Sequence, residues 1–229
     1  MKDQQLVLGA IGHIRSEFRE KFGVPKQPGL APALRAVLEL TGEWSHETCL
    51  KGLDECSHVW VIFHFHLSEA FKGGTVRPPV LGGEKRMGVF ATRSPHRPNP
   101  LGLSLVKIEK IVTAPGVAQI HVSGHDFVDG TPIFDIKPYV ASYDVPLAPA
   151  SHWSDSVPQP KTEVVWNAEA GEHKLALEQV LALDPRPRVA KPDARFGLDF
   201  AGMNVVFSFS DGKIIVEEVS SSKTSPKIK

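Results

Sequence analysis

The chain has 229 residues, of which 41% are hydrophobic and 23% charged, and its 26 lysines and arginines balance its 26 aspartates and glutamates. These proportions exclude a disordered or fibrous protein, and the length allows a substantial core with a small second unit. No apolar run has membrane-spanning length and the first residues lack a signal-peptide pattern, so we expect a cytoplasmic protein without a membrane segment.

Short strand-like segments separated by glycine and proline follow one another up to residue 140. The pattern predicts a strand over 8–16 and a short helix over 32–40. The strongest strand is predicted over 58–67, where Val59, Val61, Phe63 and Phe65 form one apolar face. Further strands are predicted at 86–92, 103–112, 118–124 and 131–140. This spacing favours an antiparallel barrel or sandwich.

The composition changes after residue 143, where a stretch rich in proline and serine indicates a linker. We therefore predict a β domain at 1–145, a linker at 146–164, a small α+β domain at 165–219 and a tail at 220–229. Within the small domain, the spacing of Leu177, Val180 and Leu181 predicts a helix. Asp211-Gly212 between two apolar runs is typical of a two-residue hairpin turn.

Basic residues are concentrated in one part of this neutral chain. Between positions 72 and 110 the sequence has only two acidic residues, Glu84 and Glu109. The same stretch has eight basic residues: Lys72, Arg77, Lys85, Arg86, Arg93, Arg97, Lys107 and Lys110. A local positive field attracts phosphate or another anion even when the whole molecule is neutral. Charge alone favours the simpler interpretation of a solvated face.

The segment "GVFATRSPHRPNPLGLS", residues 88–104, lies in this basic region. Its prolines at 95, 98 and 100 fix φ and remove backbone donors, so 94–100 is predicted to be neither a ladder strand nor a helix. A stiff loop that presents Arg93, Arg97 and Asn99 loses little entropy on binding. We interpret it as a binding site rather than a surface turn.

Two other stretches carry reactive side chains. "HDFVDGTPIFDIKPY" holds Asp126 and Asp129, and the carboxylate of Asp129 is suited either to binding a ribose or amine or to capping its own turn. His64 and His66 share one strand face and, with His58 or His125, are a candidate metal site, although histidines at this spacing are more often packed. The two cysteines, Cys49 and Cys56, fit neither a metal nor a redox motif and are expected to be reduced thiols.

Five blocks in unbroken order resemble the TrmO (YaeB-like) family of S-adenosylmethionine-dependent tRNA methyltransferases. They are "IGHIRSEFREKFGVPKQPG", "LDECSHVWVIFHFH", "RPPVLGG", "GVFATRSPHRPNPLGLS" and "VSGHDFVDGTPIFDIKPY". The resemblance covers about the first 145 residues, and "LALDPRPR" is more loosely similar to the family's C-terminal extension. The sequence departs from the family at Glu17, Lys26 and His96, where proline, arginine and an aromatic residue are usual.

The resemblance implies a mainly β fold, an antiparallel β-barrel methyltransferase domain outside the Rossmann class with a small α+β C-terminal domain. It implies methyl transfer from S-adenosylmethionine to N6 of threonylcarbamoyladenosine, next to the anticodon of a threonine tRNA, by a homodimer. The absence of a glycine-rich fingerprint agrees with this fold. The alternatives are a metal-dependent hydrolase, which the resemblance disfavours, and a non-catalytic RNA-binding barrel.

The same resemblance assigns roles to particular residues. The expected cofactor contacts are Pro25, Lys26, Gln27, His66, Leu67, Arg93, Leu103, Asp126, Asp129, Gly130 and Thr131. The candidate catalytic residues are Asp126, Lys137 and Tyr139, with no metal. Candidate RNA contacts are Arg97, Asn99, Arg186 and Arg188, the last two in a C-terminal unit that we expect to bind RNA rather than to supply chemistry.

Overall fold

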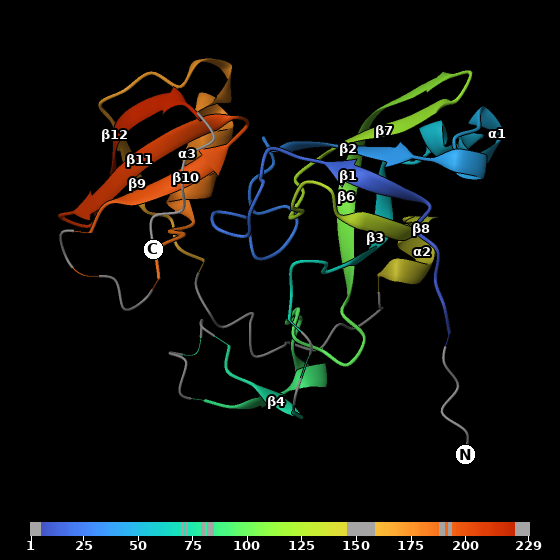
Figure 1. The fold of residues 1–229 in the computed structure, drawn as a ribbon, viewed down its shortest axis with the longest axis horizontal. Helices are drawn as coiled ribbons and strands as arrows, with labels where there is room; N and C mark the ends of the chain where they lie inside the picture. The colour runs from blue at the N-terminus through green and yellow to red at the C-terminus, as the bar shows by residue number, and fades with distance from the viewer. Residues whose placement is uncertain are drawn as a thin grey trace.

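The computed structural model describes residues 6–69, 71, 73–78, 81, 85–145, 159–187, 191 and 194–222. Figure 1 shows two β units, a barrel followed by a smaller sheet with a helix against it. The barrel closes in the order β1-β2-β7-β6-β3-β8, with every neighbouring pair antiparallel. Its strands are β1 (Gly12–Arg15), β2 (Arg35–Leu40), β3 (His58–His64), β6 (Leu101–Ala114), β7 (Val117–Ser123) and β8 (Pro132–Pro138). The predicted mainly β fold with an antiparallel barrel is confirmed.

Short elements connect the barrel strands or follow the last of them. They are α1 (Glu47–Leu50), α2 (Ala141–Asp144), the ribbon β4 (Thr75–Val76) with β5 (Met87–Gly88), and single 3-10 turns at Gly42–Trp44, Leu53–Glu55 and Val89–Ala91. None of the helices in the described residues is long and apolar enough to cross a membrane.

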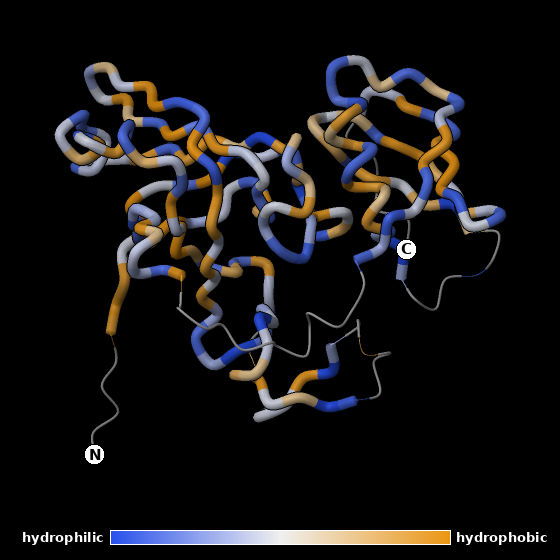
Figure 2. Tube along the Cα trace, turned by 180° about the vertical axis from the view of Figure 1, so that it is seen from behind, coloured by the Kyte–Doolittle hydropathy of each residue, from blue (hydrophilic) through white to orange (hydrophobic). Residues whose placement is uncertain are grey.

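Alternating side chains of β3 explain how the barrel core forms. Val59, Val61 and Phe63 are buried inside it, as predicted, while the intervening residues face outward. The strand ends at His64, earlier than predicted, because the next partner, just before β6, is Pro100, which accepts from the Phe65 amide at 2.8 Å but has no N–H to donate in return. Figure 2 shows the hydrophobic stretches that run along the strands of both units.

The helix predicted over 32–40 is wrong, because Arg35–Leu40 forms strand β2. Ala36, Leu38 and Leu40 alternate into the core, and the strand pairs with β1 on one side and β7 on the other. Leucine and alanine favour helices locally, but pairing on both edges and burial of one face outweigh that preference. The strand predicted over 86–92 is also largely wrong, since only Met87–Gly88 is extended before a 3-10 turn.

The C-terminal unit is a four-stranded sheet in the order β10-β11-β12-β9, with α3 (Lys174–Ala182). Its strands are β9 (Glu163–Trp166), β10 (Phe196–Phe200), β11 (Met203–Ser210) and β12 (Lys213–Ser221), and a 3-10 turn at Gly171–His173 precedes α3. The predicted helix face is confirmed, because Leu177, Val180 and Leu181 are buried. The hairpin turn is also confirmed, with φ of 51° at Asp211 and 79° at Gly212, as a type I′ turn requires.

The C-terminal core includes residues from the connection between β1 and β2. Phe18, Ala31 and Leu34 are buried with Leu177, Leu198 and other residues of the second unit. In addition, the side-chain oxygen of Gln179 in α3 accepts from the Ala33 amide at 2.8 Å. The two units therefore share a hydrophobic core. Residues 146–158 of the predicted linker lie outside the described residues, and the predicted domain boundaries stay a prediction.

Gly102 allows close packing between β6 and β3, and its replacement by alanine should destabilise the barrel. A Cβ at this position would lie 2.2 Å from Cζ of buried Phe63, whose ring is held at 5.0 Å from the rings of Phe65 and Phe127. Overpacking of this kind costs about 1–3 kcal/mol of unfolding free energy, measurable by urea titration. Gly88→Ala is the control, because nothing lies within 4 Å of its Cβ position. Equal stability of the two variants would contradict the prediction.

Candidate active site

Several predicted site residues meet at one end of the barrel, where β3 ends, β6 begins and a turn leads into β8. The Thr131 hydroxyl lies 3.3 Å from Nδ1 of His66 and donates to the carbonyl of Val128 at 2.7 Å. The Ser104 hydroxyl donates to Oδ1 of Asp126 at 2.7 Å. Barrel closure thus brings together side chains from β6, from the end of β3 and from the turn before β8.

The proline-rich loop reaches this end of the barrel from the side. Residues 94–100 form no strand or helix, as predicted. Arg93 donates from Nη1 to Oε1 of Gln27 at 2.6 Å, so two predicted cofactor residues 66 positions apart are in contact. Pro25 is buried beside them and Lys26 is exposed.

Arg97 supports the loop from within. Its Nη1 donates to the carbonyls of Thr92 at 3.2 Å and Ser94 at 3.1 Å, while Asn99 is exposed at the surface. The loop is thus stiffened by an arginine as well as by its prolines. Arg97 as an RNA contact stays a prediction.

The fold shifts the pKa of the Asp126 carboxyl. Burial raises its pKa above the ordinary value, although the hydrogen bond from Ser104 and the charge of Arg93 oppose this effect. A carboxyl whose pKa is moved towards neutrality is suited to accept a proton near physiological pH. Sequence reasoning did not select Ser104 as a site residue, although it lies in the quoted loop motif.

Asp129 connects the turn to the segment after β1. Its Oδ1 accepts from the amide of Ser16 at 3.1 Å, and its Oδ2 lies 3.9 Å from Nη1 of Arg15. Gly130 follows with φ of 74°, a value that favours glycine. Asp129 therefore does more than cap its own turn, and one of its oxygens faces a cation.

The histidines of the metal hypothesis have other partners. His125 bonds Glu17, His58 lies 2.9 Å from the hydroxyl of Ser57, and the ring of His64 stacks on Phe134. Burial lowers the pKa of His66, which favours its neutral form. Within the described residues, no group of three or more histidine, cysteine, aspartate or glutamate side chains is arranged to hold a metal ion.

Lys137 and Tyr139 are not brought to Asp126 within one chain. They lie at the far end of β8, where Lys137 pairs with Asp135 at 2.9 Å and the ring of Tyr139 is 6.1 Å from that of His58. Ser104, which bonds Asp126, is buried in the barrel and lies level with Ile136 across β3, whereas the side chain of the next residue, Lys137, is 62% exposed on the outer face of the sheet. The three catalytic candidates thus do not form one cluster in the monomer.

Of the two candidate RNA contacts in the C-terminal unit, the structure describes only Arg186. Arg186 donates from Nε and Nη2 to the carboxylate of Asp184 at 2.7 and 2.8 Å and stacks over Phe209 at 3.4 Å. Its side chain is only 16% exposed, so its guanidinium is held by protein partners. Arg188 lies outside the described residues.

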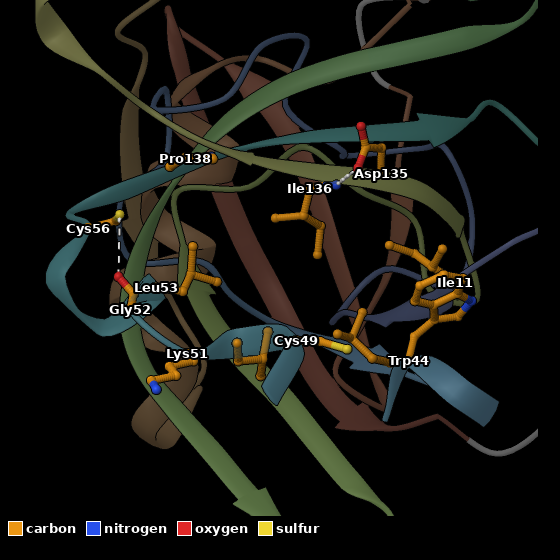
Figure 3. Close-up of a pocket in the computed structure, with 12 residues that line it drawn as sticks. Ile11, Trp44, Cys49, Lys51, Gly52, Leu53, Cys56, Asp135, Ile136 and Pro138 are labelled. Carbon is orange, nitrogen blue, oxygen red and sulfur yellow. Dashed lines mark hydrogen bonds between the residues drawn. The ribbon is translucent and has the colours of Figure 1, made fainter. Parts of the chain in front are cut away.

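A separate pocket of about 430 Å³ lies near α1, and Figure 3 shows its lining. It is mainly apolar, with Trp44, Leu53 and Ile136 among its lining residues, and both Cys49 and Cys56 lie there as free thiols. None of the predicted cofactor or catalytic residues lines it. The cationic site is therefore distinct from this pocket.

Comparison with known proteins gives consistent matches over both units. The tRNA-methyltransferase O N-terminal domain matches residues 13–145, and the TrmO C-terminal domain matches residues 159–222. The tRNA (adenine(37)-N6)-methyltransferase of Escherichia coli is 42% identical over 196 residues, which are 79% of this chain and 82% of that protein.

Two further relatives agree with these matches. A Pyrococcus abyssi protein named "Probable S-adenosyl-L-methionine-binding protein" is 42% identical over 135 residues, which are 59% of this chain and 68% of that protein. The crystal structure of TrmO from Pseudomonas aeruginosa superposes with a TM-score of 0.77 at 35% identity, covering 95% of this chain and all of that one.

Proposed function

Because this chain belongs to the tRNA-methyltransferase O (TrmO) family, we propose that it transfers a methyl group from S-adenosylmethionine to N6 of threonylcarbamoyladenosine beside the anticodon of a threonine tRNA. The observation that supports this most strongly is the carboxyl of Asp126, held by Ser104 and influenced by the charge of Arg93, at the barrel end. All three residues lie within the segment that matches the N-terminal domain of the family. The substrate, tRNA, implies a cytoplasmic enzyme.

The site has side chains that fit each part of the proposed cofactor. The guanidinium of Arg93 suits the methionine carboxylate, and the Asp129 carboxylate suits an ammonium group or ribose hydroxyls. Leu67 and Leu103 are exposed apolar side chains at the ends of β3 and β6, suited to the flat adenine ring. The remaining proposed contacts are Pro25, Lys26, Gln27, His66, Asp126, Gly130 and Thr131.

The chemistry that the chain itself must supply is positioning and proton removal. S-adenosylmethionine, when bound, supplies an electrophilic methyl group on a sulfonium. The acceptor nitrogen belongs to a urea-like group and is a weak nucleophile, so removal of its proton assists attack. Asp126 is the proposed base: its carboxylate takes the N6 proton while Ser104 orients it. Lys137 and Tyr139 would reach such a site only from a second subunit.

Exposed apolar side chains support a homodimer. Leu101 and Leu103 are 37% and 54% exposed and, two residues apart, lie on the same face of β6, and Phe90 is 81% exposed. Apolar side chains grouped in this way are typical of surfaces that another protein covers. We propose that a second copy covers them and that Arg97, Asn99 and Arg188 contact tRNA, while Arg186 could do so only by leaving Asp184.

Labelled methyl transfer tests the proposed function. The full-length chain is incubated with methyl-labelled S-adenosylmethionine and threonine tRNA with or without threonylcarbamoyladenosine, and the nucleosides are identified by mass spectrometry. We expect label on N6 only in the modified tRNA. Saturable cofactor binding with no transfer would contradict the proposed substrate. Absence of cofactor binding would favour an RNA-binding module, or a hydrolase if zinc were bound stoichiometrically.

Ser104→Ala should move the acidic limb of the pH–kcat profile to higher pH. The base acts when deprotonated, and the Ser104 hydroxyl stabilises that charged form, which lowers the pKa of Asp126. Without this donor the pKa rises further, so more alkaline solution is needed for the same activity. Ser123→Ala is the matched control, because Ser123 donates to the carboxylate of Glu109, outside the site. An unshifted limb in Ser104→Ala would show that Asp126 does not control the profile.

A further inference from the structure

Glu17, on the segment after β1, forms a buried hydrogen-bonded pair with His125. Its Oε2 accepts from Nε2 of His125 at 2.7 Å and its Oε1 accepts from the amide of Arg35 at 2.7 Å. The side chain of His125 is 0% exposed and that of Glu17 is 13% exposed. Loss of this carboxylate would leave two poorly solvated donors without a partner, which is more damaging than loss of a surface hydrogen bond.

The ionised state of Glu17 agrees with this geometry. Burial raises the pKa of Glu17, but the hydrogen bonds from His125 and from the Arg35 amide act in the opposite direction. Together they hold the pKa of Glu17 below its ordinary value. The acceptor that faces His125 is therefore a carboxylate at neutral pH.

His125 transmits this contact to the turn that carries the site residues. Its Nδ1 accepts from the amide of Phe127 at 3.1 Å, so the ring proton lies on Nε2 and points to Glu17. The imidazole is thereby held between a carboxylate on one side and the backbone of the turn on the other. Asp126 lies directly between His125 and Phe127 in the chain.

Residues 16–18 are bonded along this turn at three further points. The Ser16 hydroxyl donates to the carbonyl of Phe127 at 3.0 Å, and the Ser16 amide donates to Oδ1 of Asp129 at 3.1 Å. The amide of Asp129 donates to the carbonyl of Phe18 at 2.7 Å. The segment therefore determines the position of both acidic residues of the turn.

The other side of residues 16–18 is anchored in the C-terminal unit. Phe18 is fully buried, and its ring packs edge-to-face on Phe200 at 5.2 Å and faces His125 at 6.1 Å. The amide of Ala201 donates to the carbonyl of Glu17 at 2.8 Å. A continuous set of contacts thus runs from the C-terminal core to the turn at 126–131.

We propose that Glu17 is a positioning residue for cofactor binding, which acts through His125 to hold the 126–131 turn against a segment fixed by the C-terminal unit. The C-terminal unit then supports the cofactor site through residues 16–18, a role beyond RNA binding. This inference rests on the proposed function, because it takes the turn to bind S-adenosylmethionine. Glu17 itself touches neither cofactor nor substrate.

Calorimetric titration of full-length variants with S-adenosylmethionine tests this inference. Glu17→Ala should raise the Kd about tenfold, because the turn loses both the carboxylate and the orientation of His125. Glu17→Gln keeps an oxygen for His125 but turns an amide N–H₂ towards the Arg35 amide, so it should give an intermediate Kd. This partial rescue by the conservative variant distinguishes positioning from a general loss of stability.

The matched control is Ile214→Ala, which removes a buried side chain from the same C-terminal core, on β12. It should lower the melting temperature at least as much as Glu17→Ala and leave the Kd unchanged. Titrations are made well below the melting temperature of each variant. If Glu17→Ala does not fold, Glu17→Gln decides the question.

The outcomes separate this inference from the proposed function. A wild-type chain that does not bind S-adenosylmethionine contradicts the proposed function. A wild-type chain that binds it, together with a wild-type Kd in folded Glu17→Ala or Glu17→Gln, overturns only the positioning role. A Kd raised equally in Ile214→Ala would also overturn it, because the effect would then be general destabilisation.

Discussion

Asp126→Asn is expected to lower kcat for methyl transfer by about 10²–10⁴-fold, the range typical of a removed general base. Asparagine has nearly the same shape and still accepts the hydrogen bond from the Ser104 hydroxyl, so the barrel should remain intact. What it loses is the ability to take up the N6 proton. Single-turnover kinetics with saturating cofactor and tRNA measure this step without product release.

The control for Asp126→Asn is Asp135→Asn. Asp135 is a carboxylate in the middle of β8, where its side chain is 47% exposed and pairs with Lys137. Its replacement should leave kcat within about twofold of the wild type, since surface ion pairs contribute little. Wild-type turnover by Asp126→Asn would mean that methyl transfer depends on proximity alone or on another base. Lys137→Ala and Tyr139→Phe would then be the next variants to measure.

Arg93→Ala is expected to weaken S-adenosylmethionine binding by about tenfold to a hundredfold. A hydrogen bond to a charged group is worth about 1.5–3 kcal/mol, and the guanidinium is already directed towards the site by Gln27 at 2.6 Å. Calorimetric titration gives the Kd directly. Gln27→Ala should have a smaller effect in the same direction, because it removes only the group that orients Arg93.

Arg86→Ala distinguishes a specific contact from a general positive field. Arg86 belongs to the same basic stretch but donates to the hydroxyl of Thr75, next to the β4–β5 ribbon. A specific role for Arg93 requires that Arg86→Ala bind the cofactor like the wild type. Equal losses in both variants would mean that the net charge of the region, rather than the geometry of Arg93, attracts the cofactor.

The sequence by itself determined those features that depend on neighbouring residues. Alternation in β3 predicted the side chains that fill the barrel, and the spacing of Leu177, Val180 and Leu181 predicted helix α3. Asp211-Gly212 predicted its hairpin because both residues adopt positive φ readily. These preferences act within a few residues of the chain, so one sequence is enough to detect them.

The site was predictable only in part. The resemblance carried by the loop motif and the "DGTPIFDIKPY" block selected Arg93, Asp126 and Thr131, which the structure places at one end of the barrel. It also selected Lys137, whose side chain is exposed on β8 and pairs with Asp135 instead of reaching Asp126. Ser104 was overlooked because a serine in a strand carries no signal of its partner.

Only the tertiary structure decided which distant residues meet. Residues 35–40 form a strand because they hydrogen-bond to β1 on one side and to β7 on the other. The helix and strand preferences of the residues themselves do not predict this pairing. Glu17 and His125 are 108 positions apart, and their bond exists because barrel closure and the shared core with the C-terminal unit bring their segments together. Because His125 is buried, loss of its hydrogen bond to Glu17 would leave a donor without a partner, which costs more free energy than loss of a bond at the surface.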